Sequence, residues 1–157
     1  MVVDINADLD LGYLAQFVGA RINELVLDKA RAEGHGDLRQ SHGYVVQHLV
    51  EGPKQITQLA QLLGVSQQAA SKSVGELVEL GYVTSTVSGD RRAREVALSA
   101  MGKAARAQTR KTRARIEQKL LARHGRELAR AKHLLAAVLE ELGGAEAVRA
   151  RRVREPR

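Results

Sequence analysis

The feature that most constrains the fold is a pair of short amphipathic runs joined by a glycine turn, ITQLAQLLGVSQQAASKSVGELVELG, from Ile56 to Gly81. Thr57 is a good N-cap for the first run, and Ser66 is a good N-cap for the second. Gly64 suits the left-handed backbone conformation that ends a helix, because it has no Cβ. Two helices joined by a three-residue turn with a glycine form a helix-turn-helix pattern. The predicted inner positions are Leu59, Ala60, Leu63, Ala70, Val74 and Leu77.

Two β-type runs follow the second helix at once and predict a hairpin with strands at Tyr82–Val87 and Arg94–Leu98. The turn between them, Ser88–Ala93, carries Arg91 and Arg92. An isolated two-stranded hairpin is marginally stable in water, so this one is expected to pack on the helix pair as an arm. Arginine at a narrow tip suits the minor groove of DNA, where negative potential is concentrated. A solvated basic turn without a function is the alternative.

Residues 56–103 resemble the DNA-binding lobe of the MarR family of winged-helix regulators. The matching motifs are LAQLLGVS, the frame S-x-x-A-A-S-K-x-V-x-x-L, the exit at Gly81, and the wing Asp90-x-Arg92 followed by Leu98-Ser99 and Gly102. Ser99 stands where the family pattern has threonine, and Gly75 stands where the family often has aspartate. The order of the flanking helices also fits the family, so the likeness covers nearly the whole chain in topology and about a third of it in motif.

The resemblance implies that the second helix reads DNA in the major groove and that the wing enters the minor groove. Glutamine can contact adenine with two hydrogen bonds, serine and lysine can meet bases or phosphates, and Ala69 can touch a thymine methyl group. In the wing, Arg92 is expected in the groove with Asp90 orienting the turn, while Arg91 and Arg94 meet phosphates. An ordinary amphipathic surface helix is the alternative for the second helix. The expected DNA-binding residues are Gln67, Gln68, Ala69, Ser71, Lys72, Asp90, Arg91, Arg92 and Arg94.

Helical periodicity continues on both sides of this region. Apolar residues at steps of three and four predict a helix over residues 8–33. A shorter helix, capped by Asp37 or Ser41, is expected to end at Gly52-Pro53. After Ser99, one long basic helix is predicted to run to Gly125, and another continues to Gly143-Gly144.

The predicted fold class is therefore mainly α (α+β), with the whole chain forming a single MarR-like domain. A winged helix-turn-helix lobe is expected at residues 38–103. Residues 6–34 and 104–144 are expected to build a helical dimerisation lobe, and residues 145–157 a basic, disordered tail. A homodimer would place two recognition helices roughly 34 Å apart on a palindromic double-stranded site. A core confined to one subunit is the alternative.

The net charge of +7 is unevenly distributed along the 157 residues. Residues 1–99 carry a balance of −3, and residues 100–157 carry +10. A basic chain favours polyanions, with nucleic acid ahead of an anionic membrane; a solvated helix surface with a basic tail is the alternative. Aromatic residues make up only 3%, which argues against stacking of single-stranded bases. No apolar run is long enough to cross a bilayer, and the acidic N-terminus lacks the features of a signal peptide.

The resemblance also implies a small anionic or aromatic effector between the dimerisation lobe and the DNA-binding lobe, whose binding lowers DNA affinity. The candidate ligand-binding residues are Tyr13, Phe17, His42, Tyr44 and His48. Five histidines make a metal sensor conceivable, but none has the spacing of a known zinc motif, and no metal or other cofactor is expected. The chain has no cysteine, which is compatible with a cytoplasmic location. No set of catalytic residues stands out, so an enzyme is not expected.

The sequence thus predicts a homodimeric, sequence-specific transcriptional regulator, a repressor, whose DNA affinity responds to a small ligand. Three alternatives remain open at this point. One is an architectural, low-specificity DNA-binding protein driven by the basic C-terminal half. The second is a metal-responsive regulator, and the third is a winged helix that binds protein and has no need of Arg92.

Overall fold

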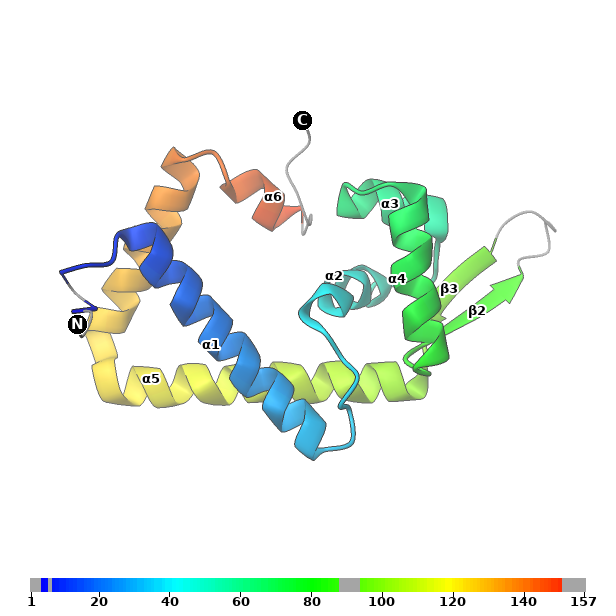
Figure 1. Cartoon of the computed structure of the whole chain (residues 1–157), viewed down its shortest axis with the longest axis horizontal. Helices are drawn as coiled ribbons and strands as arrows, with labels where there is room; N and C mark the ends of the chain where they lie inside the picture. Colours follow the sequence, from blue (N-terminus) through cyan, green and yellow to red (C-terminus); the bar gives the residue numbers. More distant parts are fainter. Residues whose placement is uncertain (1–3, 6, 88–93, 151–157) are drawn as a thin grey trace.

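The computed structural model describes residues 4–5, 7–87 and 94–150. The described chain is mostly helical, with one small antiparallel sheet (Figure 1), so the predicted class, a mainly α fold with a winged helix-turn-helix lobe, is confirmed. The elements in chain order are α1 Leu11–Ala32, α2 Gln40–Leu49, β1 Lys54–Gln55, α3 Ile56–Leu63, α4 Gln67–Glu79, β2 Val83–Val87, β3 Arg94–Leu98, α5 Ala100–Glu141 and α6 Ala145–Arg149.

The elements form two lobes joined by α5 (Figure 1). Elements α2 to β3 make a compact unit, here called the reader lobe, whereas α1, α5 and α6 make an extended helical lobe. Helix α1 crosses α5 and packs on it, and Asn23 of α1 accepts a hydrogen bond from Arg113 of α5. Helix α5 begins beside the reader lobe and runs away from it, so one helix belongs to both lobes.

Three of the predicted helix ends have the expected chemistry. Gly64 ends α3 in the left-handed region, with φ of 67°. Ser66 caps α4, where its side chain accepts a hydrogen bond from Ala69 N at 3.2 Å. Ser99 caps α5, where its hydroxyl accepts from Gly102 N at 3.0 Å and donates to the Gly81 carbonyl at 2.6 Å. Ser99 therefore provides a capping hydroxyl for α5.

Helix α3 begins two residues earlier than predicted, because its cap is Gln55 rather than Thr57. The backbone N–H of Gln55 is satisfied by the Gln58 side chain at 3.0 Å, so no hydroxyl cap is needed. The same segment forms β1, a two-residue strand that the sequence pattern does not predict. Its Lys54 lies opposite Val96, which makes β3 the central strand between β1 and β2.

Helix α2 also has a different cap from the predicted Asp37 or Ser41. Its N-cap is Arg39, and Ser41 lies inside the first turn. The backbone N–H of Arg39 donates to Nδ1 of His42 at 3.3 Å. A side chain that reaches back from within the helix thus replaces an Asp or Ser cap.

The helical lobe differs from the prediction at two points. Helix α1 starts after Asp10, whose carboxylate accepts from Tyr13 N at 2.9 Å, and not at Asp8. The predicted break at Gly125 is present, since two helical stretches of α5 meet there at a kink with φ of 48° and ψ of −122°. Residues 145–149, expected within a disordered tail, form the short helix α6.

The hydrophobic core lies in the reader lobe, beneath the sheet and between α2, α3 and α4. Its members are Val45, Leu49, Leu59, Leu63, Val74, Leu77, Tyr82, Val83, Val96, Leu98 and Ala105. Only Val26 and Ala30 are buried in α1, and only Gly102 and Ala105 in α5. No helix in the described part of the chain is long and apolar enough to cross a membrane.

Candidate DNA-binding surface and adjoining cavity

Helix α4 is held by its inner face and presents a polar outer face. Ala70, Val74 and Leu77 are buried to 3% exposure or less, as predicted from the spacing. Five predicted reading residues are all exposed, and four of them line one shallow depression of the surface. The exposed five are Gln67, Gln68, Ala69, Ser71 and Lys72, and all but Ala69 line the depression. Since the inner face fixes the rotation of α4, these side chains are presented together to any partner.

The wing consists of β2 and β3, with Val83 opposite Leu98 and Thr86 opposite Glu95. Arg94, at the start of β3, is exposed. The predicted tip residues Asp90, Arg91 and Arg92 lie outside the described residues. The two paired strands leave the base of α4 side by side and extend away from the helical lobe (Figure 1). The wing and α4 therefore lie at the same end of the molecule.

A polar cluster ties α4 to α2. The Glu76 carboxylate accepts from Arg39 Nη2 at 2.6 Å and lies 3.2 Å from His42 Nε2. The pKa of Glu76 falls below its usual 4.5, chiefly because His42 hydrogen-bonds the carboxylate; burial opposes this shift, and the positive charges of Arg39 and Lys72 add to it. Glu76 therefore stays ionised at neutral pH. Its negative charge lies one helical turn from Lys72, a predicted DNA-reading residue on the same helix.

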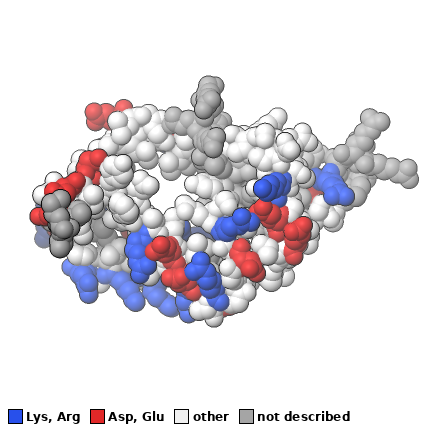
Figure 2. Space-filling view, in the orientation of Figure 1, with Lys and Arg blue, Asp and Glu red and all other residues white. Residues whose placement is uncertain are grey.

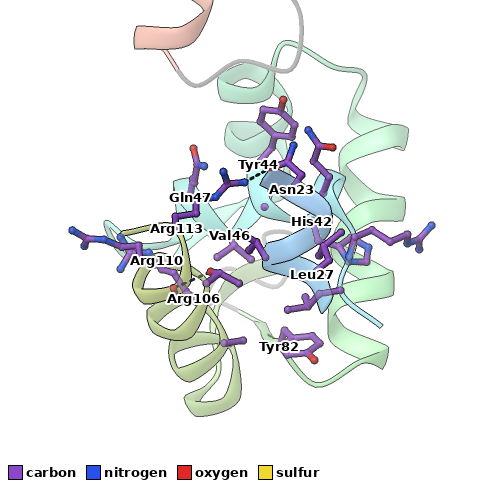
Figure 3. A pocket seen from close by; sticks show the side chains of 18 residues that line it. Asn23, Leu27, His42, Tyr44, Val46, Gln47, Tyr82, Arg106, Arg110 and Arg113 are labelled. Carbon is purple, nitrogen blue, oxygen red and sulfur yellow. Dashed lines mark hydrogen bonds between the residues drawn. The ribbon is translucent and has the colours of Figure 1, made fainter. Parts of the chain in front are cut away.

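A cavity of about 610 Å³ lies where the two lobes meet. Residues of α1, α2 and α5 line it together with Tyr82, and Figure 3 shows Arg106 and Arg110 on the opposite side from His42 and Leu27. No Asp or Glu is among the described residues that line it, whereas four arginines are: Arg39, Arg106, Arg110 and Arg113. The three on α5 follow one another at helical steps of four and three, so one face of that helix is cationic. The apolar part of the lining includes Val26, Leu27, Leu38 and Val46.

The predicted ligand-binding residues are divided between this cavity and other places. His42, which is 1% exposed, and Tyr44 line the cavity. His48 is buried but is not among the lining residues. Tyr13 and Phe17 lie near the start of α1 with about 60% of their surface exposed, away from the lining. The structure thus brings two of the five together.

Sequence reasoning missed the arginines of α5 as cavity residues and missed the link from Glu76 to Arg39. The spacing of Arg106, Arg110 and Arg113 was a readable signal of a shared face. The Arg39–Glu76 contact joins residues 37 positions apart, and no local pattern indicates it. Among the described residues, no three or more His, Asp or Glu side chains gather closely enough to hold a metal ion.

Surface charge differs between the lobes. Figure 2 shows Lys and Arg side chains in a row along the lower edge of the molecule, where α5 runs in Figure 1. Over the middle of the same face, acidic and basic side chains are mixed. On this face, the basic side chains of α5 are thus spread along the helix.

Comparisons with known proteins agree with this architecture. Residues 37–93 match the sequence model of the MarR family. YusO from Bacillus subtilis is 19% identical with a TM-score of 0.66, over 83% of this chain and 93% of that one. A mutant MarR from E. coli complexed with operator DNA is 22% identical with a TM-score of 0.62, over 88% and 99%. The heme sensor PefR from Streptococcus agalactiae, in complex with heme, is 18% identical with a TM-score of 0.62, over 84% and 93%.

No curated protein sequence matches the chain significantly. The family model covers the reader lobe up to the wing, and the structural similarity extends over both lobes. Residues 37–93 thus resemble the MarR family in sequence, and the chain as a whole shares the fold of these MarR structures.

Proposed function

We propose that this protein is a homodimeric, sequence-specific DNA-binding transcriptional repressor whose DNA affinity falls when a small organic anion occupies the cavity. The observation that carries the proposal is the outer face of α4, where Gln67, Gln68, Ser71 and Lys72 are exposed together on a helix fixed by its buried face. Amide, hydroxyl and ammonium groups are those that read base edges and phosphates in the major groove. A structural neighbour bound to operator DNA supports this use of the fold.

A homodimer is supported by apolar side chains that the single chain leaves in water. Helix α1 exposes Leu11, Tyr13, Phe17 and Val18, and each has half or more of its surface exposed. The end of α5 exposes several leucines, with Leu142 at 78%. Apolar faces of this kind are expected to be covered, and a second copy offers the same helices. Sedimentation analysis is expected to show a dimer, and a monomer at micromolar concentration would contradict the proposal.

The ligand is proposed from the cavity lining. Guanidinium groups bind carboxylates with paired hydrogen bonds, and the apolar residues Val26, Leu27 and Val46 suit a flat hydrocarbon body. The ligand class is therefore a small carboxylate with an aromatic or apolar body. A structural neighbour with bound heme shows that the fold can hold a small molecule.

Footprinting over the DNA upstream of the protein's own gene, followed by binding isotherms on the protected site and on random duplex, tests the DNA-binding part. A regulator is expected to keep at least about a thousandfold preference for its site at physiological salt. An architectural DNA-binding protein would instead show a small ratio between its affinities for the protected site and for random duplex. Its affinity for both duplexes would fall steeply as the salt concentration rises. Addition of benzoate, as a simple aromatic carboxylate, is expected to weaken the specific complex.

A further inference from the structure

Two residues at the start of α2, its N-cap Arg39 and His42, belong both to the cavity lining and to the cluster that holds α4. Arg39 and His42 line the cavity, and both bind the carboxylate of Glu76. Glu76 lies on α4, one turn after Lys72, whose side chain is on the reading surface. The cavity lining is therefore joined to α4 by two side-chain contacts to Glu76, which lies one helical turn from Lys72.

The contacts that His42 and Arg39 make with Glu76 differ in how easily they can be broken. His42 is 1% exposed, and its Nδ1 accepts the backbone N–H of Arg39 at 3.3 Å. The ring proton is thereby placed on Nε2, which donates to Glu76 from a buried, fixed position. Arg39 is different, since 61% of its side chain is exposed and the guanidinium carries spare donors. Exposed ion pairs contribute little to stability, so Arg39 can leave Glu76 at small cost.

We propose that Arg39 couples the cavity to the recognition helix by exchanging Glu76 for an anion bound in the cavity. In the free protein Arg39 offsets the charge of Glu76, and Lys72 is available to DNA. When a carboxylate in the cavity draws Arg39 away, Glu76 is left with His42 and becomes the nearest anion for Lys72 on the same helix face. Lys72 then competes between Glu76 and phosphate, so the anion weakens DNA binding. The inference rests on the proposed function, because it takes an anion in the cavity and DNA on α4.

A ligand-free experiment tests the electrostatic link directly. DNA affinity of the full chain is measured by fluorescence anisotropy for wild type, Arg39→Gln, Glu76→Gln and the double variant, with circular dichroism as a check of folding. Arg39→Gln is expected to weaken binding roughly fivefold, the lower end of typical coupling between sites. In the Glu76→Gln background the same change is expected to have no effect, because the charge that captures Lys72 is absent.

A matched control tests whether the loss of any positive charge, and not that of Arg39 in particular, weakens DNA binding. Arg31 is an exposed arginine of α1 that pairs with Asp28 at 2.6 Å and does not line the cavity, so Arg31→Gln is expected to leave DNA affinity unchanged. If Arg39→Gln weakens binding equally with and without Glu76, Arg39 contacts DNA itself and the exchange mechanism is wrong. Unchanged affinity of Arg39→Gln in the wild-type background overturns it as well.

A second experiment uses benzoate as the probe. Wild type is expected to lose DNA affinity about fivefold or more with saturating benzoate. Glu76→Gln is expected to bind benzoate at least as tightly by calorimetry, since Arg39 no longer has a competing partner, while its DNA affinity no longer responds. A Glu76→Gln protein that responds like wild type overturns the coupling and leaves the proposed function standing. If wild type has no site preference on DNA, or neither binds nor responds to benzoate, the corresponding part of the proposed function fails, and the coupling fails with it.

Discussion

A single methyl group at Gly102 is expected to disturb the joint between the reader lobe and α5. Gly102 lies in the first turn of α5, against the backbone of Tyr82. An added Cβ would lie 2.0 Å from the Tyr82 carbonyl oxygen, and real Cβ atoms essentially never come within 3.0 Å of another heavy atom. The first turn of α5 and the backbone of Tyr82 must therefore move apart by about 1 Å. Both groups are backbone, so no side chain can move aside to relieve the contact.

The cost has three parts. Separation stretches the hydrogen bond from Ser99 N to the Tyr82 carbonyl, 3.0 Å long, a kind of contact worth about 0.5–1.5 kcal/mol. Overpacking of a well-packed site costs about 1–3 kcal/mol. Alanine is favoured over glycine inside a helix by about 1 kcal/mol, which offsets part of this. The expected net loss in the free energy of unfolding for Gly102→Ala is about 2 kcal/mol.

Urea unfolding followed by far-ultraviolet circular dichroism, at one fixed protein concentration, measures this loss. The matched control is Gly75→Ala in α4, where an added Cβ meets no heavy atom within 4 Å. That variant is expected to gain about 0.5–1 kcal/mol from the change in backbone entropy alone. A Gly102→Ala protein as stable as wild type, or stabilised like the control, would refute the close approach.

Three further predictions concern DNA binding and titration. Arg92→Ala is expected to weaken binding to the specific site by about 1–3 kcal/mol with an unchanged circular dichroism spectrum. Unchanged affinity would contradict the assignment of Arg92 as a DNA contact of the wing. Gln68→Ala is expected to relax base preference at one position per half-site in a selection experiment, whereas Lys72→Ala is expected to weaken all sequences alike and to lower the salt slope by about one. Burial, and to a smaller extent the charge of Asp37, raises the pKa of Tyr82 above 10.0. Its contribution to stability is therefore complete below pH 10.0 and lost as the pH rises through the folded-state pKa, and Tyr82→Phe is expected to remove the last step of a tyrosinate absorbance titration.

Local chemistry made the reader lobe largely predictable from sequence. The serine caps at Ser66 and Ser99 and the left-handed turn at Gly64 are decided by residues within one turn of the helix end. The strand Arg94–Leu98 has the predicted bounds, because alternation and the following cap limit it on both sides. The buried face of α4 likewise follows from its helical period.

Features that depend on distant partners were not predictable in the same way. Strand β1 is two residues long and exists only because β3 offers it a free edge. The break in α5 at Gly125 was predictable from the glycine, but the direction in which the second stretch leaves the first depends on packing. The cavity and the Arg39–Glu76 contact require α2, α4 and α5 to be placed in space first.

The division of buried side chains between the lobes bears on how an anion in the cavity would act in the proposed dimer. The core of the reader lobe includes Ala105 of α5, whereas within the described chain no side chain of α5 beyond Ala105 is buried. Helix α5 carries the cavity arginines in its first half and exposed leucines such as Leu134 and Leu135 in its second half. Helix α5 therefore meets the reader lobe, the cavity and the proposed partner. Since a dimeric reader recognises its site through two helices held roughly 34 Å apart, a displacement of α5 at the cavity changes the spacing that DNA must match. A Glu76→Gln protein separates this route from the local competition for Lys72, because any response to benzoate that it keeps comes from the spacing, whereas the coupling through Glu76 predicts that it keeps none.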